Sequence, residues 1–323
     1  MSLIKQIKHN RKKIFLIILS IIIVPVLGLK AYVEIDNIIY ESRIEKMNMQ
    51  SNQIESPIEH KTLKMDGYDI HYFVSGKEHN DLIVFLHPAF SDHRAFDLQV
   101  DYFSKNYRVI TIDFIGHGLS KANKSKDKID ASSKHIEKIL EIEGFDKVHI
   151  VGVSMGALIA QYFALQYPEK ILSLTALGGY NINKENKEVT KAQSSSNFAL
   201  VLRAIFSMNS FRKKTAKITC HTESGQALFY KTASLYERKS FMVMQGLQNV
   251  IKDRENVITE YPTLILTGEF DIDLAKKMAK EWHSEIDNSE YYMIENAGHC
   301  ANIDKPLEFN EIMEEFIQKK KNN

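Results

Sequence analysis

From residue 61 onward, short runs rich in Val, Ile, Leu, Phe and Tyr alternate with longer stretches in which apolar residues recur at helical spacing. Most of the short runs are apolar along their whole length, which is typical of strands covered on both faces. Strands of this kind joined by helices predict an α/β fold, with a mostly parallel sheet between two layers of helices. The first two runs, on either side of Asp66 and Gly67, predict an antiparallel hairpin at one edge. The runs occupy 61–65, 69–76, 81–88, 107–114, 147–154, 171–179, 263–270 and 290–298.

The alternation is interrupted between residues 181 and 260, where no run predicts a strand. Several stretches in this interval have helical spacing instead, namely 197–208, 223–235 and 238–252. The interval therefore predicts a helical insertion of about 80 residues that lies over the sheet.

The first 60 residues follow a different pattern. Residues 1–13 hold five Lys and Arg and no acidic residue, and they lead into an uncharged apolar run, Ile14–Leu29. With residues 30–33 added, this segment is long enough to cross a hydrocarbon core of about 30 Å. We therefore expect an uncleaved transmembrane signal anchor at 14–33, with 1–13 in the cytoplasm and all later residues outside. Residues 34–60 have no strong apolar period and predict a stalk, part of which can be helical.

Two other interpretations of this apolar run are a buried core helix and a cleaved signal peptide. A buried core helix is disfavoured because the run is apolar all round and precedes a polar linker. A cleaved signal peptide would give a secreted protein, but residues 26–31 match a cleavage site poorly.

Composition narrows the classes of protein further. The chain has 323 residues, of which 44% are hydrophobic and 26% charged, so intrinsic disorder is excluded. A formal net charge of +1 excludes a protein built to coat nucleic acid. Because five basic residues lie within 1–13, the rest of the chain is mildly acidic. Cys220 and Cys300 are expected to be buried free thiols, although a disulfide is chemically possible outside the cytoplasm.

The predicted strand at 147–154 runs into the sequence Gly152-Val153-Ser154-Met155-Gly156 and then into an apolar helical stretch. A strand that turns sharply into a helix strains the backbone at its central residue and raises that side chain above the sheet edge. The flanking glycines leave room for the turn. This context predicts Ser154 as a nucleophile rather than an ordinary turn serine.

A serine hydroxyl needs a base, and the base needs an acid that orients it. His299 follows the last predicted strand and Asp271 follows the strand before it, so both are expected at the same sheet edge as Ser154. Asp273 and Glu269 are the second and third candidates for the acid.

The segments FLHPAF, DFIGHGLS, GVSMGA, LTGEFD and NAGHCANIDKP follow the order found in the α/β-hydrolase fold family, which residues 61–320 resemble. The resemblance is to the capped serine esterase and lipase branch. It implies a catalytic triad of Ser154, Asp271 and His299, an acyl-enzyme intermediate, and a hydrolase domain at 61–323 whose helical cap is 181–260.

The same resemblance implies an oxyanion hole formed by the backbone N–H groups of Ala89 and Met155. The family usually has glycine where this chain has Pro88, and proline has no N–H to donate. The donor position maps to Ala89, so the hole can be retained, with Phe90 as an alternative donor.

Three neighbouring features are expected to be structural. Residues 113–120 predict a turn, His87 is expected to form hydrogen bonds within the oxyanion loop, and Cys300 is expected to pack beside His299. The sequence has no P-loop, dinucleotide fingerprint or metal-binding motif, so we expect neither a cofactor nor a metal.

Most of the apolar residues of the insertion are expected to pack the cap onto the sheet domain. Phe90, Phe206 and Phe229 are predicted to contact the substrate. Together with the membrane anchor, they favour a carboxylic ester with a medium or long acyl chain, such as a monoacylglycerol. The alternatives are a C–C bond hydrolase or a lactonase with the same triad, and a membrane-tethered binding protein without activity.

Overall fold

The computed structural model describes residues 3–48, 56–122, 125–186, 198–255 and 257–321. Eight strands form one sheet in the order β1-β2-β4-β3-β5-β6-β7-β8. The pairs β1/β2 and β2/β4 are antiparallel and all other neighbours are parallel, as the apolar runs predicted. The strands are β1 Glu59–Met65, β2 Tyr68–Ser75, β3 Leu82–Leu86, β4 Arg108–Ile112, β5 Val148–Val153, β6 Ile171–Leu177, β7 Thr263–Gly268 and β8 Ser289–Ile294.

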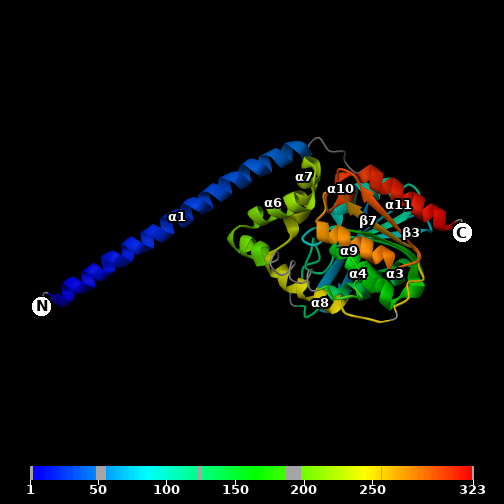
Figure 1. Ribbon diagram of the computed structural model, residues 1–323, viewed down its shortest axis with the longest axis horizontal. Coiled ribbons are helices and arrows are strands. Elements are labelled where there is room, and N and C mark those ends of the chain that lie inside the picture. The colour runs from blue at the N-terminus through cyan, green and yellow to red at the C-terminus, as the bar shows by residue number, and fades with distance from the viewer. Residues whose placement is uncertain (1–2, 49–55, 123–124, 187–197, 256, 322–323) are drawn as a thin grey trace.

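Helices cover both faces of this sheet (Figure 1). The helices α3 (Ser132–Glu143), α4 (Met155–Gln166) and α9 (Asp273–Ser284) pack on one face. The other face is covered by α2 (Asp97–Phe103), α10 (Ala301–Asp304) and α11 (Pro306–Lys321). Burial on both sides explains why β3, β5 and β7 have no exposed position. Short single turns lie at His93–Phe96, Ile129–Ala131 and Pro168–Lys170.

The chain between β6 and β7 forms a helical layer at one end of the sheet domain, and we call its residues 198–250 the cap. It contains a helix at 198–206, α6 (Met208–Thr219), α7 (Glu223–Thr232) and α8 (Leu247–Val250). Two 3₁₀ helices, Ala233–Leu235 and Arg238–Gly246, connect α7 to α8. Residues 187–197 of the predicted insertion lie outside the described residues.

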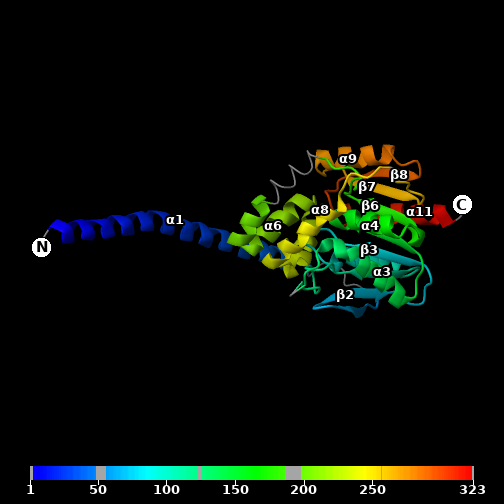
Figure 2. The same ribbon diagram turned by 90° about the horizontal axis from the view of Figure 1, so that it is seen from below.

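The helix α1 (Leu3–Asn48) docks on the cap through its last turns. Asp36 forms an ion pair with Lys213 at 2.7 Å, and Asn37 donates a hydrogen bond to Ser207 at 3.2 Å. Tyr230 donates to Glu41 at 2.6 Å. Figures 1 and 2 show the rest of α1 projecting away from the domain on the cap side. Residues 34–48, predicted as part of a stalk, are therefore a docked helix, and residues 59–60 already belong to β1.

The predicted anchor at 14–33 lies within α1, where the side chains of residues 14–22 fall outside the described part of the chain. Among the residues that are described, no helix has both the length and the apolar character needed to cross a membrane.

Candidate active site

The turn from β5 into α4 holds Ser154 in a strained backbone conformation. Ser154 has φ 54° and ψ −117°, which few residues other than glycine adopt. A Cβ on Gly156 would lie 2.0 Å from the carbonyl oxygen of Leu86, and one on Gly152 would lie 2.3 Å from the backbone carbon of Gly156. Both glycines are therefore required for the close approach of β5, α4 and β3 that raises Ser154 to the sheet edge.

His299 lies in the segment between β8 and α10, with its imidazole against Asp271. Its Nδ1 is 2.9 Å from one carboxylate oxygen of Asp271 and 3.0 Å from the other. The Asp271 side chain is completely buried, so solvent does not compete for this contact. A Cβ on Gly178, at the end of β6, would come within 2.7 Å of His299 Cε1, so the ring rests directly on this backbone.

The charge environment of His299 favours the imidazolium form. Burial alone would lower its pKa, but the charge of Asp271 and the hydrogen bond to it outweigh this effect and raise the pKa to about 9. The other two candidates for the acid are engaged elsewhere. Glu269 accepts a hydrogen bond from the backbone N–H of Asn296, and Asp273 is fully exposed beside Lys276.

The segment after β3 holds the first predicted oxyanion donor, Ala89, and Met155 is the first residue of α4. His87 fixes the start of this segment. Its Nε2 accepts from the N–H of Phe114 at 3.1 Å, so Nδ1 carries the proton and donates to the carbonyl of Pro88 at 2.8 Å. Burial lowers the pKa of His87, which keeps it in this neutral form. The expected hydrogen bonding of His87 within the oxyanion loop is confirmed.

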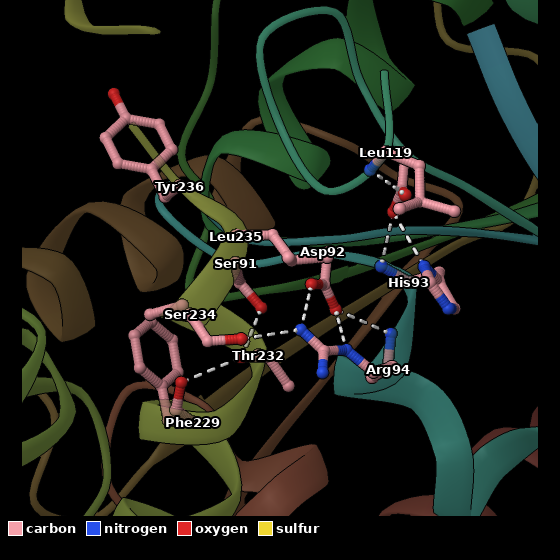
Figure 3. Close-up of polar contacts among 12 residues, drawn as sticks. Ser91, Asp92, His93, Arg94, Leu119, Phe229, Thr232, Ser234, Leu235 and Tyr236 are labelled. Atoms are coloured by element: carbon pink, nitrogen blue, oxygen red, sulfur yellow. Dashed lines mark hydrogen bonds and ion pairs between the residues drawn. The ribbon is translucent and has the colours of Figure 1, made fainter. Parts of the chain in front are cut away.

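A network that the sequence analysis did not single out connects this loop to the cap (Figure 3). Ser91 donates to Thr232 at 2.8 Å, and Thr232 in turn donates to the carbonyl of Phe229 at 2.9 Å. The guanidinium of Arg94 binds both oxygens of Asp92, at 2.9 and 2.5 Å, and donates to Ser234 at 3.1 Å. The only sequence signal for this network is an acid and a base placed two residues apart in a predicted loop.

The turn at 113–120 supports the same loop from the other side. Asp113 accepts from the backbone N–H and the Nδ1 of His93, at 2.8 and 2.9 Å, and from the N–H of Leu119 at 2.8 Å. A Cβ on Gly118, which has φ +49°, would lie 2.1 Å from an Asp113 oxygen. The expected structural role of this segment is confirmed.

Asp92, His93 and Asp113 are also the only group within the described residues that could offer three ligand atoms to a metal, all within 4.8 Å. Arg94 occupies both oxygens of Asp92, and N–H donors occupy those of Asp113. A cation would have to displace an internal ion pair, so the group does not fit a metal centre.

A cavity of about 300 Å³ joins the predicted catalytic residues. Ser154, His299, Ala89 and Met155 all line it, and within the described part of the chain no Asp, Glu, Lys or Arg does. The remaining walls come mainly from apolar side chains of the segment after β3, the cap with the residue that follows it, α4 and the start of α9: Phe90, Leu158, Phe229, Met244, Leu247, Ile251, Ile272, Leu274 and Met278.

Two of the three residues predicted to contact the substrate line this cavity, and the third does not. Phe90 and Phe229 line the cavity. Phe206 is not among the lining residues and is 37% exposed, so its contact with the substrate stays a prediction. Because the helix 198–206 has apolar residues on two faces, the sequence did not distinguish its inner face from its outer one.

Cys220 and Cys300 are both free and buried, as expected. Burial, reinforced by the neighbouring Cys300, raises the pKa of the Cys220 thiol well above its usual value. A buried protonated thiol is a poor nucleophile, and neither cysteine is among the residues that line the cavity.

Comparison with known proteins identifies the fold. The model of the alpha/beta hydrolase fold family matches residues 81–209. Epoxide hydrolase 1 of Caenorhabditis elegans is 23% identical over 309 residues, which cover 86% of this chain and 75% of that protein. Monoacylglycerol lipase ABHD6 of Bos taurus is 24% identical over 273 residues, covering 79% and 81%. A crystal structure of a membrane phospholipase A matches with a TM-score of 0.70 and 18% identity, over 97% of this chain and 100% of that one.

Proposed function

Since this chain is an enzyme of the α/β-hydrolase fold, we propose that it cleaves carboxylic esters with Ser154 as nucleophile, His299 as base and Asp271 as the orienting acid. One observation carries the proposal. The Nδ1 of His299 is held by both oxygens of a buried Asp271, and His299 and Ser154 line the same cavity, whose other walls are mainly apolar.

In the proposed mechanism, His299 takes the proton of Ser154 while the serine oxygen attacks the ester carbonyl. The N–H groups of Ala89 and Met155 stabilise the tetrahedral oxyanion, each donor contributing about 3 kcal/mol to lowering the barrier. The C–O bond to the alcohol then breaks, and the alcohol leaves with the proton from His299. Water, deprotonated by the same histidine, cleaves the acyl-enzyme and regenerates Ser154.

The cavity supports a substrate with one neutral acyl chain. Its volume lies near the lower end of the range of about 300–1,000 Å³ usual for ligand sites. Its apolar walls favour hydrocarbon, and among the described lining residues no Asp, Glu, Lys or Arg is present to pair with an ionic group of the substrate. We therefore propose an ester with a medium or long acyl chain, of the monoacylglycerol type.

We also propose that residues 14–33 anchor the enzyme in the cell membrane. The support comes from the sequence: a 16-residue run without charge follows a segment with five basic residues and no acid. In this arrangement residues 1–13 lie in the cytoplasm and the catalytic domain lies outside. Alkaline extraction of cell membranes tests the anchor, since a secreted, cleaved product would appear in the medium with a mass lower by about 3 kDa, at roughly 110 Da per residue.

Epoxide hydrolysis is less well supported, although a relative carries that name. Opening an epoxide through a covalent intermediate requires a carboxylate nucleophile, because its attack forms an ester that water can later hydrolyse. Position 154 is a serine, and its alkyl ether with the substrate could not be hydrolysed in this way.

Labelling with a fluorophosphonate probe tests the nucleophile. Wild type and Ser284→Ala, a change at an exposed serine on α9, should be labelled, whereas Ser154→Ala should not. A series of esters of increasing acyl length should show hydrolysis that falls by at least about 10³-fold in Ser154→Ala. No hydrolysis of any ester by folded, probe-reactive wild type would favour the lactonase or C–C hydrolase chemistry. Folded wild type that does not react with the probe would favour a binding protein.

A further inference from the structure

The cap exposes four large apolar side chains along one face of a single helix. Phe198, Leu202, Ile205 and Phe206 are 66%, 51%, 64% and 37% exposed. Their spacing of four, three and one residues places them on one side of the helix at 198–206.

This exposed row is not needed to hold the cap together. The opposite face of the same helix already packs through Leu200 and Ala204 against Phe211 and Tyr236. A helix packed on the protein by one face normally carries polar residues on the other. A contiguous apolar surface that is not buried in the fold is typical of a surface that binds a partner or a membrane.

The cap is richer in basic residues than the rest of the molecule. Residues 198–239 hold eight Lys and Arg but only two acidic residues, although the whole chain is nearly neutral. Beyond residue 13, the remainder of the chain is therefore clearly acidic. Lys214 and Lys217 are exposed on α6, the helix that follows the apolar row. A cap that carries both exposed apolar residues and an excess of basic ones matches the chemistry of an anionic lipid surface, where hydrocarbon lies under phosphate.

The position of α1 is consistent with a lipid surface next to the cap. Asn37 of α1 contacts Ser207, the residue that directly follows the exposed row, and Asp36 contacts Lys213. In both views α1 leaves the domain from the cap (Figures 1 and 2). A bilayer that holds the segment before residue 33 therefore lies on the side of the molecule where the cap is found.

We propose that the cap is a lipid-binding surface: Phe198, Leu202, Ile205 and Phe206 enter the boundary between headgroups and acyl chains, and Lys214 and Lys217 bind the phosphates of anionic lipids. This inference builds on the proposed membrane anchor and adds a second, separate contact with the bilayer. The same cap supplies Thr219 and Phe229 to the cavity, so docking would place the cavity next to its lipid substrate.

Quenching of tryptophan by brominated lipids tests the contact directly. The full chain carrying Leu202→Trp is reconstituted in vesicles containing bromine on the upper acyl carbons. The single native tryptophan, Trp282, is 4% exposed and supplies a constant background. The matched control is Ile142→Trp on α3, a position that is 59% exposed but lies outside the cap.

We expect at least twofold stronger quenching at position 202 than at 142, increasing with the fraction of phosphatidylglycerol in the vesicles. The double variant Lys214→Glu, Lys217→Glu should reduce this difference. Equal quenching at the two positions would overturn the proposal. Weak quenching at 202 together with cross-linking of two chains through this helix would assign the surface to a second copy of the protein and would equally overturn it.

Activity separates this inference from the proposed function. Leu202→Glu with Ile205→Glu should lower hydrolysis of a long-chain ester embedded in vesicles by about tenfold or more, while hydrolysis of a soluble short-chain ester stays unchanged. If wild type hydrolyses no soluble ester, the proposed function fails, but the quenching result still decides whether the cap contacts lipid. If the variant hydrolyses both the vesicle-embedded ester and the soluble ester as fast as wild type does, the docking proposal fails while the proposed function stands.

Discussion

Asp271 holds the imidazole of His299 through both carboxylate oxygens, at 2.9 and 3.0 Å, from a position that solvent does not reach. The carboxylate therefore controls both the orientation of the imidazole and the pH at which it is neutral.

The first prediction concerns the pH profile. A base must be unprotonated to act, and the pKa of His299 is about 9, so kcat/KM of the wild type should rise with pH around a midpoint near 9. In Asp271→Asn the charge that raises this pKa is removed, so the midpoint should move to lower pH. The maximal rate should fall by about 10³–10⁴-fold because the ring loses its orientation. Rates corrected for spontaneous hydrolysis between pH 5 and 10 measure both effects, and an unshifted midpoint would argue against His299 as the base.

A second prediction follows from the same pKa and concerns stability. A histidine with a raised pKa in the folded state binds its proton more tightly there than in the unfolded chain, where its pKa is about 6.5. The resulting stabilisation is fully present below pH 6.5 and is lost as the pH rises through about 9. Urea unfolding of Asp271→Asn should therefore show a smaller loss of stability between pH 6.5 and 9 than wild type does. A parallel pH dependence in the two proteins would contradict the prediction.

The network between the oxyanion loop and the cap gives a third prediction. Arg94→Ala leaves the carboxylate of Asp92 buried without its partner, a change that typically destabilises by about 3–5 kcal/mol. Because the loop that carries Ala89 is then less well held, kcat should fall more than KM changes. The double variant Arg94→Ala, Asp92→Ala should recover much of the stability. Stability is measured by thermal unfolding, and failure of the second substitution to restore it would show that the ion pair is not the main interaction.

A fourth prediction concerns acyl length. Met244 and Met278 line the cavity from the cap and from α9. Replacing either by tryptophan fills part of the volume, so the preferred acyl chain should become shorter while kcat for a short ester stays within about threefold. The control Ile142→Trp should leave the preference unchanged, since this residue is exposed on α3. A chain-length profile that is the same in wild type and in all three variants would place the acyl group outside this cavity.

The sheet and the positions of the candidate triad could be predicted from the sequence for a common reason. The strands are marked by short apolar runs, and the carboxyl ends of parallel strands meet at one edge, so residues just after β5, β7 and β8 are brought together. Ser154 was further marked by its two glycines, which the structure shows in contact with neighbouring backbone.

Contacts between distant parts of the chain could not be predicted in the same way. Asn37 and Ser207 are 170 residues apart, and neither lies in a pattern that names its partner. The Asp92–Arg94 network could not be predicted from the sequence either, because its residues follow no helical or strand period. The exposure of Phe206 could not be predicted for a related reason: an apolar residue on a helix indicates burial only when the direction of that face is known.

The attachment of α1 has a mechanical consequence. Its described contacts with Ser207, Lys213 and Tyr230 all lie on the cap, so the helix and the cap form one body. If the far end of α1 is fixed, the cap is fixed with it, because the polar contacts named above all join α1 to cap residues. A force along α1 would then act first on the cap, which supplies Thr219 and Phe229 to the cavity wall. It would act only afterwards on the strands that precede Ser154, Asp271 and His299.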